Sequence, residues 1–307
     1  MTAIRKIAIV GASGNLCQAL LPVLTKANFH VTAICRPSSA AAFPDNVEVE
    51  KTEYTLDSLT RSLKGKDAVI CVLDATALKE EALVIDAAAQ AGVKWFVPSE
   101  FGHNTADERV LSTLPLLKGK AGIIAQLESK KASGMKWVGL VTGLFFDWCM
   151  AQNMLSFDIG KKTAVIWDDG ETKFHTTNIG DIGTALVNLF SNSEILSQVE
   201  NTYVYISSFE TTQNQILAEL ERATGTTFEV QRVRSEDMKT RALTALAGGD
   251  WSSIGALLHY LAWGEAKLGH YGELADQGDR LLLAQREGLS ATVDRIVASV
   301  EGFKTAL

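Results

Sequence analysis

Residues 7–17 read Ile7-Ala8-Ile9-Val10-Gly11-Ala12-Ser13-Gly14-Asn15-Leu16-Cys17, and this stretch decides the fold. The apolar run before Gly11 predicts a buried strand, and the amphipathic pattern after Gly14 predicts a helix. Glycine permits a tight turn between the two, and the free amides at a helix N-terminus bind phosphate. A chance turn would give the same letters. Their position between a strand and a helix favours dinucleotide binding.

The candidate cofactor contacts come from this loop. In the common dinucleotide fingerprint, a third glycine allows close packing of the helix on the strand. Here that position holds Cys17, whose side chain is small, so we expect the helix to lie slightly farther from the strand. The loop residues expected to contact the cofactor are Gly11, Ser13, Gly14, Asn15 and Leu16.

Beyond the loop, the first half of the chain alternates β-rich runs with helical patterns. This alternation is typical of the α/β class with a doubly wound (Rossmann) parallel sheet. Several runs are almost entirely apolar, as expected for strands covered on both faces. The expected strands are Lys6–Val10, His30–Cys35, Val47–Lys51, Ala68–Leu73, Lys94–Val97 and Lys136–Val141. The expected helices are Asn15–Asn28, Leu56–Leu63, Leu78–Ala91 and Lys120–Ser133.

The pattern changes after about residue 145. Thr163–Trp167 and Glu171–Thr176 flank Asp168-Asp169-Gly170, which predicts a β-hairpin. Further along, the patterns predict a helix from Asp181 to Asn192, a helix over Gln213–Thr224 capped by Thr211-Thr212, a strand over Thr227–Val233, and mostly helices over 235–307.

These patterns divide the chain into two expected domains. Residues 1–150 would form the NADP(H)-binding Rossmann domain, joined by a later strand near 203–206. Residues 151–307 would form a smaller, mainly helical substrate-binding domain. With no clear linker between them, we expect the two parts to pack closely.

The end of the second expected strand indicates which dinucleotide is bound. NAD sites usually place a carboxylate there for the ribose diol, whereas NADP sites place arginine against the 2′-phosphate. The chain has Arg36 at this point and Ser38 two residues later. Arginine bonds phosphate through two N–H groups, so we expect NADPH/NADP+. A surface arginine at a strand end is the alternative.

A second informative stretch is Phe96-Val97-Pro98-Ser99-Glu100-Phe101-Gly102. The expected strand stops at the proline, and the loop opens at the carboxyl edge of the sheet, where ligands bind in open α/β folds. An ordinary strand exit has a similar composition. The loop gains meaning from the phosphate loop before it and from Lys120 after it.

Taken together, these residues resemble the isoflavone-reductase-like, NmrA-like branch of the atypical short-chain dehydrogenases/reductases. The resemblance rests on Gly11–Gly14, Arg36, Val97–Gly102 and Lys120. It covers the first 150 residues well and continues more weakly through Asp181-Ile182-Gly183 and Trp263-Gly264-Glu265. It implies an NADPH-dependent reductase of secondary metabolism that acts on a small aromatic, phenylpropanoid- or polyketide-like compound.

The resemblance also implies that Lys120 is catalytic, because the family's lysine opens the helix that follows the Pro-Ser-Glu-Phe-Gly loop. A lysine beside a nicotinamide would bond a substrate oxygen and supply a proton. Lys120 is expected to contact the cofactor too, together with Pro98 and Ser99. Lys118 is the alternative, but Lys120 better matches the family's Lys-Ala pair, so we expect Lys118 to face solvent.

Substrate contacts are expected around the carboxyl edge of the sheet. The aromatic pair after the sixth strand would stack on a planar substrate, although it equally fits a role in joining the two cores. His259 resembles a histidine that some family members place in the substrate pocket, and His103 follows the signature loop; a structural imidazole is the alternative for both. The expected substrate contacts are Glu100, Phe101, Phe145, Phe146 and His259.

Two other functions remain open on this scaffold. One is an NmrA-like NADP(H)-sensing regulatory protein without catalysis. The other is an isomerase or cyclase that uses Lys120 without net redox change. An intact signature loop and Lys120 argue against a pure sensor, because sensing does not require the lysine.

Composition bears on partners and location. The formal net charge of −7 gives a nucleic-acid partner no electrostatic support. The longest apolar stretch, 137–151, contains Asp147 and is too short to span a bilayer. The four cysteines lack a spacing suited to metal, and we expect free thiols in a reducing compartment. The first strand leaves no room for a signal peptide, so we expect a cytoplasmic monomer or homodimer with no metal.

Overall fold

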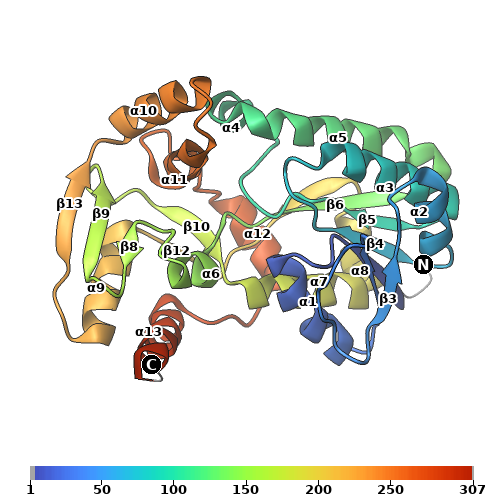
Figure 1. The fold of residues 1–307 in the computed structure, drawn as a ribbon, viewed down its shortest axis with the longest axis horizontal. Coiled ribbons are helices and arrows are strands. Elements are labelled where there is room, and N and C mark those ends of the chain that lie inside the picture. Colours follow the sequence, from blue (N-terminus) through green and yellow to red (C-terminus); the bar gives the residue numbers. More distant parts are fainter. Residues whose placement is uncertain (1–3, 306–307) are drawn as a thin grey trace.

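A seven-stranded parallel sheet forms the larger part of the molecule (Figure 1). The computed structural model describes residues 4–305, with side chains to residue 300. Every neighbouring pair of strands in this sheet is parallel. The order is β11 (Thr202–Tyr205), β6 (Lys136–Val141), β5 (Trp95–Val97), β4 (Ala68–Cys71), β1 (Lys6–Val10), β2 (His30–Cys35) and β3 (Glu48–Lys51). The expected doubly wound α/β fold is confirmed.

Strand β1 shows how both faces of this sheet are buried. Ile7 and Ile9 enter one hydrophobic cluster, whereas Ala8 and Val10 enter another, because successive side chains point to opposite faces. Helices α1 (Asn15–Lys26), α7 (Ile179–Ser191) and α8 (Ser193–Gln198) cover the first face. Helices α2 (Leu56–Leu63), α3 (Leu78–Ala91) and α5 (Lys118–Ser129) cover the second. Apolar side chains are thus required on both faces of the strand.

The strand expected near 203–206 does return to the main sheet, as β11 beside β6. Helix α12 (Glu273–Leu282) packs against β11 and α7. At Gly278 a Cβ atom would lie 1.9 Å from the Tyr205 carbonyl oxygen. The helix can therefore pack this close to the strand only because residue 278 is glycine. Residues from the second half of the chain therefore complete the main sheet. The domain boundary near residue 150 remains a prediction.

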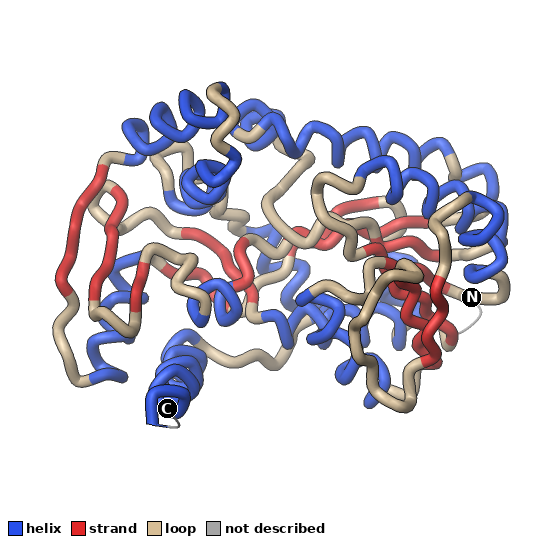
Figure 2. The backbone as a smooth tube through the Cα atoms, in the orientation of Figure 1, coloured by secondary structure: helices blue, strands red, loops and turns tan. Residues whose placement is uncertain are grey.

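Two three-stranded sheets and several helices form the second part of the molecule, at the opposite end from the main sheet (Figure 2). One sheet has the order β12 (Phe209–Thr211), β10 (Phe174–Thr177), β7 (Leu144–Phe145). The other has the order β13 (Glu229–Val233), β9 (Thr163–Trp167), β8 (Phe157–Asp158). The helices are α6 (Phe146–Ala151), α9 (Gln213–Thr224), α10 (Ser235–Ala247), α11 (Ile254–Trp263) and α13 (Leu289–Thr305). The expected helical character of 235–307 is confirmed over 235–305, and the last two residues lie outside the described part of the chain.

The predicted hairpin at Asp168-Asp169-Gly170 is wrong. Both strands form, but β9 pairs with β13 and β8, whereas β10 pairs with β12 and β7. A turn closes between Gly170 N and Trp167 O, and Asp168 N then donates to Val233 O, which extends the pairing with β13. With both edges of β9 already paired, the chain after the turn continues into the other sheet.

Several predicted boundaries shift by a few residues. Helix α5 begins at Lys118 rather than Lys120, because a short 3-10 helix, η1 (Pro115–Leu117), runs directly into it. Its predicted end separates into a second 3-10 helix, η2 (Lys131–Ser133). Helix α7 begins before Asp181, where the Ile179 N–H donates to Asp147. The cap at Thr212 is confirmed as a capping box with Gln215.

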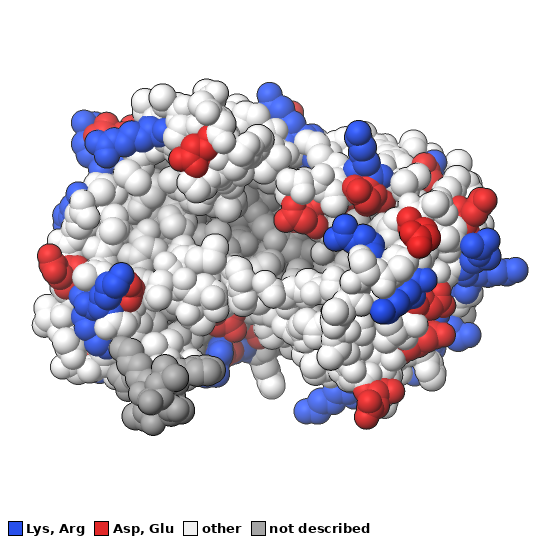
Figure 3. Space-filling view, in the orientation of Figure 1, with Lys and Arg blue, Asp and Glu red and all other residues white. Residues whose placement is uncertain are grey.

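The cysteine thiols are buried and the charged side chains are spread over the surface in view, as in an ordinary globular protein (Figure 3). The four cysteines (17, 35, 71 and 149) are buried free thiols, as expected. Lysine, arginine and acidic side chains are interspersed on the face shown in Figure 3, and a hollow with few charges opens between the two parts. Within the described residues, no helix combines the length and the apolar character needed to cross a bilayer.

Gly278→Ala tests the contact between α12 and β11. The added Cβ would collide with backbone, so we expect a loss of about 1–3 kcal/mol in the free energy of unfolding. Gly122→Ala in α5 is the matched control, because a Cβ there meets nothing within 4 Å and alanine favours the helix by up to about 1 kcal/mol. Urea unfolding of both variants measures the difference. Equal stabilities would contradict the close approach.

Candidate active site

The phosphate loop has a geometry that only glycine permits. Gly11 has φ 85°, and a Cβ there would lie 2.8 Å from the Val72 carbonyl oxygen. Gly14 caps α1 without a side-chain hydrogen bond, and the first turn of α1 holds no acidic residue. The amide groups and the positive end of the helix dipole are therefore left for an anionic ligand. A dinucleotide pyrophosphate fits this end of the helix.

A cavity of about 500 Å³ adjoins the loop. Its walls include Gly11, Ser13, Gly14 and the exposed Arg36 at the end of β2. Three expected residues lie outside these walls. Ser38 is exposed in the turn that follows Arg36, and Asn15 and Leu16 lie at the start of α1. The cavity therefore collects four of the seven residues expected around the pyrophosphate and the ribose phosphate.

Among the residues of this cavity that sequence reasoning missed are Glu53 and Tyr54. They follow β3, and Tyr54 has a φ of 56°, which turns the chain toward the phosphate loop. Burial raises the pKa of the Tyr54 hydroxyl to about 12. Neither residue follows a glycine motif or the end of β2, so no local signal in the sequence marks them.

Lys120 lies against the signature loop. Its Nζ donates to the Ser99 carbonyl oxygen at 2.5 Å and to the Glu100 carbonyl oxygen at 3.3 Å. Lys118 is exposed, as expected, whereas Lys120 is half-buried. The Ser99 hydroxyl donates to the Leu73 carbonyl oxygen at 2.5 Å, and Leu73 lines the cavity beside the phosphate loop. The signature loop thus connects the lysine to the cavity.

Two buried carboxylates lie at this loop, one within it (Glu100) and one on α3 (Glu81). Burial raises the pKa of Glu81, which sequence reasoning missed, and the Ser99 N–H and the Lys120 charge oppose that rise. Burial likewise raises the pKa of Glu100, against the Lys120 charge and a hydrogen bond from Thr105. The Glu100 carboxylate accepts from Thr105 Oγ1 at 2.6 Å, and this hydroxyl lies 3.2 Å from Tyr203 OH. The Glu100 carboxylate therefore points into an internal hydrogen-bond network, and its predicted contact with a substrate remains a prediction.

The expected aromatic contacts divide between core and edge. Phe146 is fully buried and packs edge-on against Phe209 at 4.9 Å between ring centroids, so its position favours the core role that was the alternative, and the substrate contact remains a prediction. Phe145 is half-buried and packs against the core clusters of both parts, which is the alternative role foreseen for the pair. Phe101 is half-buried against the main core, and Pro98 leads the loop at the end of β5.

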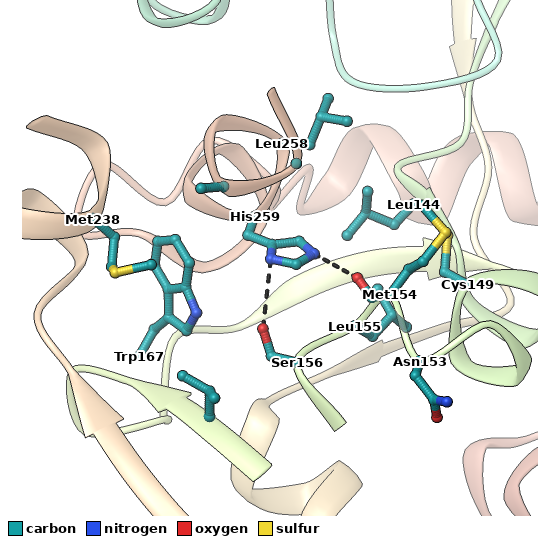
Figure 4. Close-up of a pocket in the computed structure, with 13 residues that line it drawn as sticks. Leu144, Cys149, Asn153, Met154, Leu155, Ser156, Trp167, Met238, Leu258 and His259 are labelled. Carbon is teal, nitrogen blue, oxygen red and sulfur yellow. Dashed lines mark hydrogen bonds between the residues drawn. The ribbon is translucent and has the colours of Figure 1, made fainter. Parts of the chain in front are cut away.

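His259 lines a second cavity, of about 430 Å³, in the second part of the molecule (Figure 4). Its ring stacks on Trp263 at 4.8 Å between centroids. Nε2 lies 2.6 Å from the Met154 carbonyl oxygen, which can only accept, so Nε2 carries the proton and Nδ1 faces Ser156 Oγ at 3.5 Å. Burial lowers the pKa of His259 to about 4. The walls are mostly apolar, from side chains such as Leu144, Val165, Trp167, Met238 and Leu258.

His103 lies close to both Lys120 and His259. It is 5% exposed, and neither ring nitrogen forms a well-aligned hydrogen bond with a described residue. Burial lowers its pKa to about 4, the His259 and Lys120 charges act in the same direction, and the Leu258 backbone opposes them. The loop that carries His103 is fixed at Gly102, whose carbonyl accepts from Thr142 N and Gly143 N. His103 is therefore a buried, neutral imidazole on which the Lys120 charge acts.

A cluster that the sequence did not predict brings His175, Glu210 and His270 together, with ligand atoms within 4.8 Å of one another. His175 Nδ1 accepts the Tyr271 N–H at 3.0 Å, so the ring proton sits on Nε2, which faces Glu210. A nitrogen that carries a proton has no lone pair for a metal. Lys173 also donates to Glu210 at 2.7 Å. Hydrogen bonds and ion pairs account for this cluster.

Comparisons with known proteins agree with this geometry. A model of the NmrA-like family matches residues 4–248. The chain belongs to the NmrA-like family. Oxidoreductase aprR of Aspergillus flavus is 29% identical over 299 residues, which are 96% of this chain and 98% of aprR. The isoflavone reductase homolog IRL of Zea mays is 29% identical over 248 residues, 75% of this chain and 78% of that protein. The resemblance inferred from the motifs is confirmed.

A solved structure also shares the fold of this NmrA-like protein. AtPrR2 with NADP+ and (+)pinoresinol superposes with a TM-score of 0.78 over 96% of this chain and 100% of that chain. The sequences are 18% identical, so the likeness concerns the fold. It covers the second part of the molecule as well as the main sheet.

Arg36→Gln tests the predicted choice of dinucleotide. Hydrogen bonds to a charged group contribute about 1.5–3 kcal/mol, so we expect the Kd for NADPH to rise about 10- to 100-fold with the Kd for NADH unchanged. Titration calorimetry with both dinucleotides measures the two constants. Arg241→Gln, on the exposed surface of α10, is the control. An equal loss for both dinucleotides would contradict a phosphate contact.

The lowered pKa of His103 predicts that the folded protein loses stability in acid. Its pKa is about 4 in the folded protein against an ordinary 6.5, so the folded state disfavours protonation and stability falls as the pH drops from about 6.5 to 4. In His103→Gln we expect a shallower slope, by up to one proton, in urea unfolding free energies measured between these pH values. His30→Gln, at an exposed histidine, should keep the wild-type slope. A wild-type slope in His103→Gln would contradict the neutral buried ring.

Proposed function

We propose that this NmrA-like protein is an NADPH-dependent reductase that transfers hydride to a small aromatic metabolite. One observation carries the proposal: the Lys120 ammonium rests on the Ser99 and Glu100 carbonyls, at the carboxyl edge of the sheet and next to the dinucleotide cavity. Ligands of open α/β sheets bind at this edge. Relatives named oxidoreductase and isoflavone reductase homolog support the reaction class.

The chain offers NADPH a site with separate parts for its two phosphate groups. The α1 amides behind Gly14 would hold the pyrophosphate, and Arg36 would pair with the 2′-phosphate. Gly11 lets the loop approach the Val72 carbonyl oxygen after β4, and the cavity beside the loop would take the adenosine. When bound, NADPH supplies a hydride. The protein contributes binding and orientation.

Lys120 would supply the proton that accompanies the hydride. Its ammonium has three N–H donors, of which two are directed at the loop carbonyls, so one remains for a substrate oxygen. Negative charge develops on that oxygen as hydride arrives at carbon, and a positioned cation stabilises it. Transfer of the proton from Nζ to oxygen completes the reduction and leaves a neutral amine, which solvent protonates before the next turnover.

The aromatic nature of the substrate is supported by the cavity around His259. Its volume of about 430 Å³ and its apolar walls suit a planar ring system. His259 Nδ1 is an acceptor that pairs only weakly with Ser156, at 3.5 Å, so a phenolic hydroxyl would bond there. The fold is shared with a structure that contains (+)pinoresinol, itself an aromatic compound.

Lys120→Met tests the catalytic role. General acid catalysis contributes about 10²–10⁴-fold, so we expect kcat to fall by that factor with the Kd for NADPH changed less than about twofold. NADPH oxidation measured at 340 nm with a panel of aromatic ketones and enones provides the readout. Lys118→Met removes an exposed lysine two residues away and should keep wild-type turnover.

The same panel distinguishes the reductase from the two alternative functions. A sensor or a non-redox isomerase would bind NADPH without consuming it, whatever the ketone or enone. Wild-type turnover in Lys120→Met would instead leave the reductase in place and remove Lys120 from the mechanism.

A further inference from the structure

Glu81 is a buried carboxylate on the inner side of the signature loop. It lies in the first turn of α3 and is 2% exposed. Its Oε1 accepts the Ser99 N–H at 2.7 Å. An ionised carboxylate loses hydration at this depth, and that loss is large unless hydrogen bonds and opposite charge replace the water. The groups that act on Glu81 therefore indicate the role of this carboxylate in the site.

Lys120 is the cation that acts on Glu81. Burial raises the pKa of the carboxyl, and the Ser99 N–H, the Lys120 charge and the Cys71 thiol oppose the rise, whereas the Glu100 charge adds to it. No direct ion pair joins the two described side chains. They meet through one residue, because Glu81 holds the N–H of Ser99 and Lys120 holds its carbonyl oxygen.

We propose that Glu81 is a positioning residue for Lys120: it fixes the Ser99 backbone that receives the ammonium, and it places a carboxylate beside the lysine at the edge of the dinucleotide cavity. The inference rests on the proposed role of Lys120 in proton transfer. It adds a second charged group to that role, from a helix that carries no part of the signature loop.

The other groups that face Lys120 are less able to do this. Asp74, after β4, is exposed and already accepts both the N–H and the hydroxyl of Thr76. The Glu100 carboxylate accepts a hydrogen bond from Thr105, and the Thr105 hydroxyl in turn lies 3.2 Å from the Tyr203 hydroxyl. His103 is neutral above pH 4, and burial keeps the Cys71 thiol protonated. Glu81 is the buried acid whose backbone partner also binds the lysine.

Glu81→Gln separates the charge from the hydrogen bond. The amide oxygen of glutamine still accepts the Ser99 N–H, so the loop keeps its anchor while the negative charge is removed. Asp86→Asn is the matched control, because it removes a carboxylate from the same helix, where Asp86 faces Lys130 and Gln126 instead.

The primary measurement is the titration of Lys120 in the protein without dinucleotide, followed by the ¹³Cε signal of labelled lysine and assigned with Lys120→Arg. We expect the midpoint in Glu81→Gln to fall by about one pH unit, as for loss of one nearby charge in a partly buried site. The midpoint in Asp86→Asn should stay at the wild-type value. Wild-type midpoints in both variants would overturn the proposal.

A reciprocal measurement covers the case in which Glu81→Gln does not fold. Coupling between two sites is mutual, so Lys120→Met should raise the midpoint of the Glu81 carboxyl ¹³C signal by a similar amount. Lys118→Met should not move it. An unchanged Glu81 midpoint in Lys120→Met would overturn the proposal without use of any Glu81 variant.

Turnover then separates this proposal from the proposed function. In Glu81→Gln, the alkaline limb of the pH–rate profile with NADPH should move to lower pH, with the acid-side rate retained. If Lys120→Met keeps turnover, the role of Lys120 fails whatever Glu81 does. If Lys120→Met loses turnover but Glu81→Gln keeps the wild-type profile, the role of Glu81 alone fails.

Discussion

The Ser99 backbone is the point on which the candidate site depends. Its N–H binds Glu81 from α3, its carbonyl binds Lys120 from α5, and its hydroxyl binds the Leu73 carbonyl after β4. Three separate elements of the Rossmann half therefore meet at a single residue. Because all three bonds are made within a partly dry interior, each is stronger than it would be in water, and none is replaced easily by solvent.

This arrangement explains why the catalytic candidate lies on a helix and its anchor lies on a loop. A helix holds the lysine backbone rigidly, while the loop supplies carbonyl oxygens at the sheet edge where a ligand arrives. The loop is in turn tied to the second part of the molecule, because the Gly102 carbonyl binds Thr142 and Gly143, and a Cβ at Gly143 would lie 2.4 Å from the His175 carbonyl oxygen. The main sheet and the second part of the molecule are thus held in a fixed relation.

Histidines illustrate how the fold assigns roles that composition does not reveal. His103, His175 and His259 are all poorly protonated because burial lowers each pKa to about 4. Their partners differ: a backbone N–H for His175, a backbone carbonyl for His259, and no well-aligned partner among the described residues for His103. These partners fix the tautomers of the His175 and His259 rings, with the proton on Nε2 in both.

The main sheet, the phosphate loop and the signature loop were predictable from local sequence, because each depends on residues close together in the chain. Apolar runs must be buried on both faces, and Gly11 is required where backbone meets backbone at Val72. Family resemblance identified Lys120 on the same local grounds. The pairing of β9 and β10 was not predictable, since edge partners are chosen by distant strands such as β13 and β12.

The sequence by itself determined the α/β class, the phosphate loop, the signature loop and the lysine that follows them. Only the tertiary structure decided that Glu81 lies beneath the loop, that Glu100 and Phe146 point into the interior, and that Glu53 and Tyr54 complete the cavity. The physical reason is the same in each case. A side chain's role depends on what its charge or its apolar surface meets, and those neighbours come from parts of the chain that no local pattern connects.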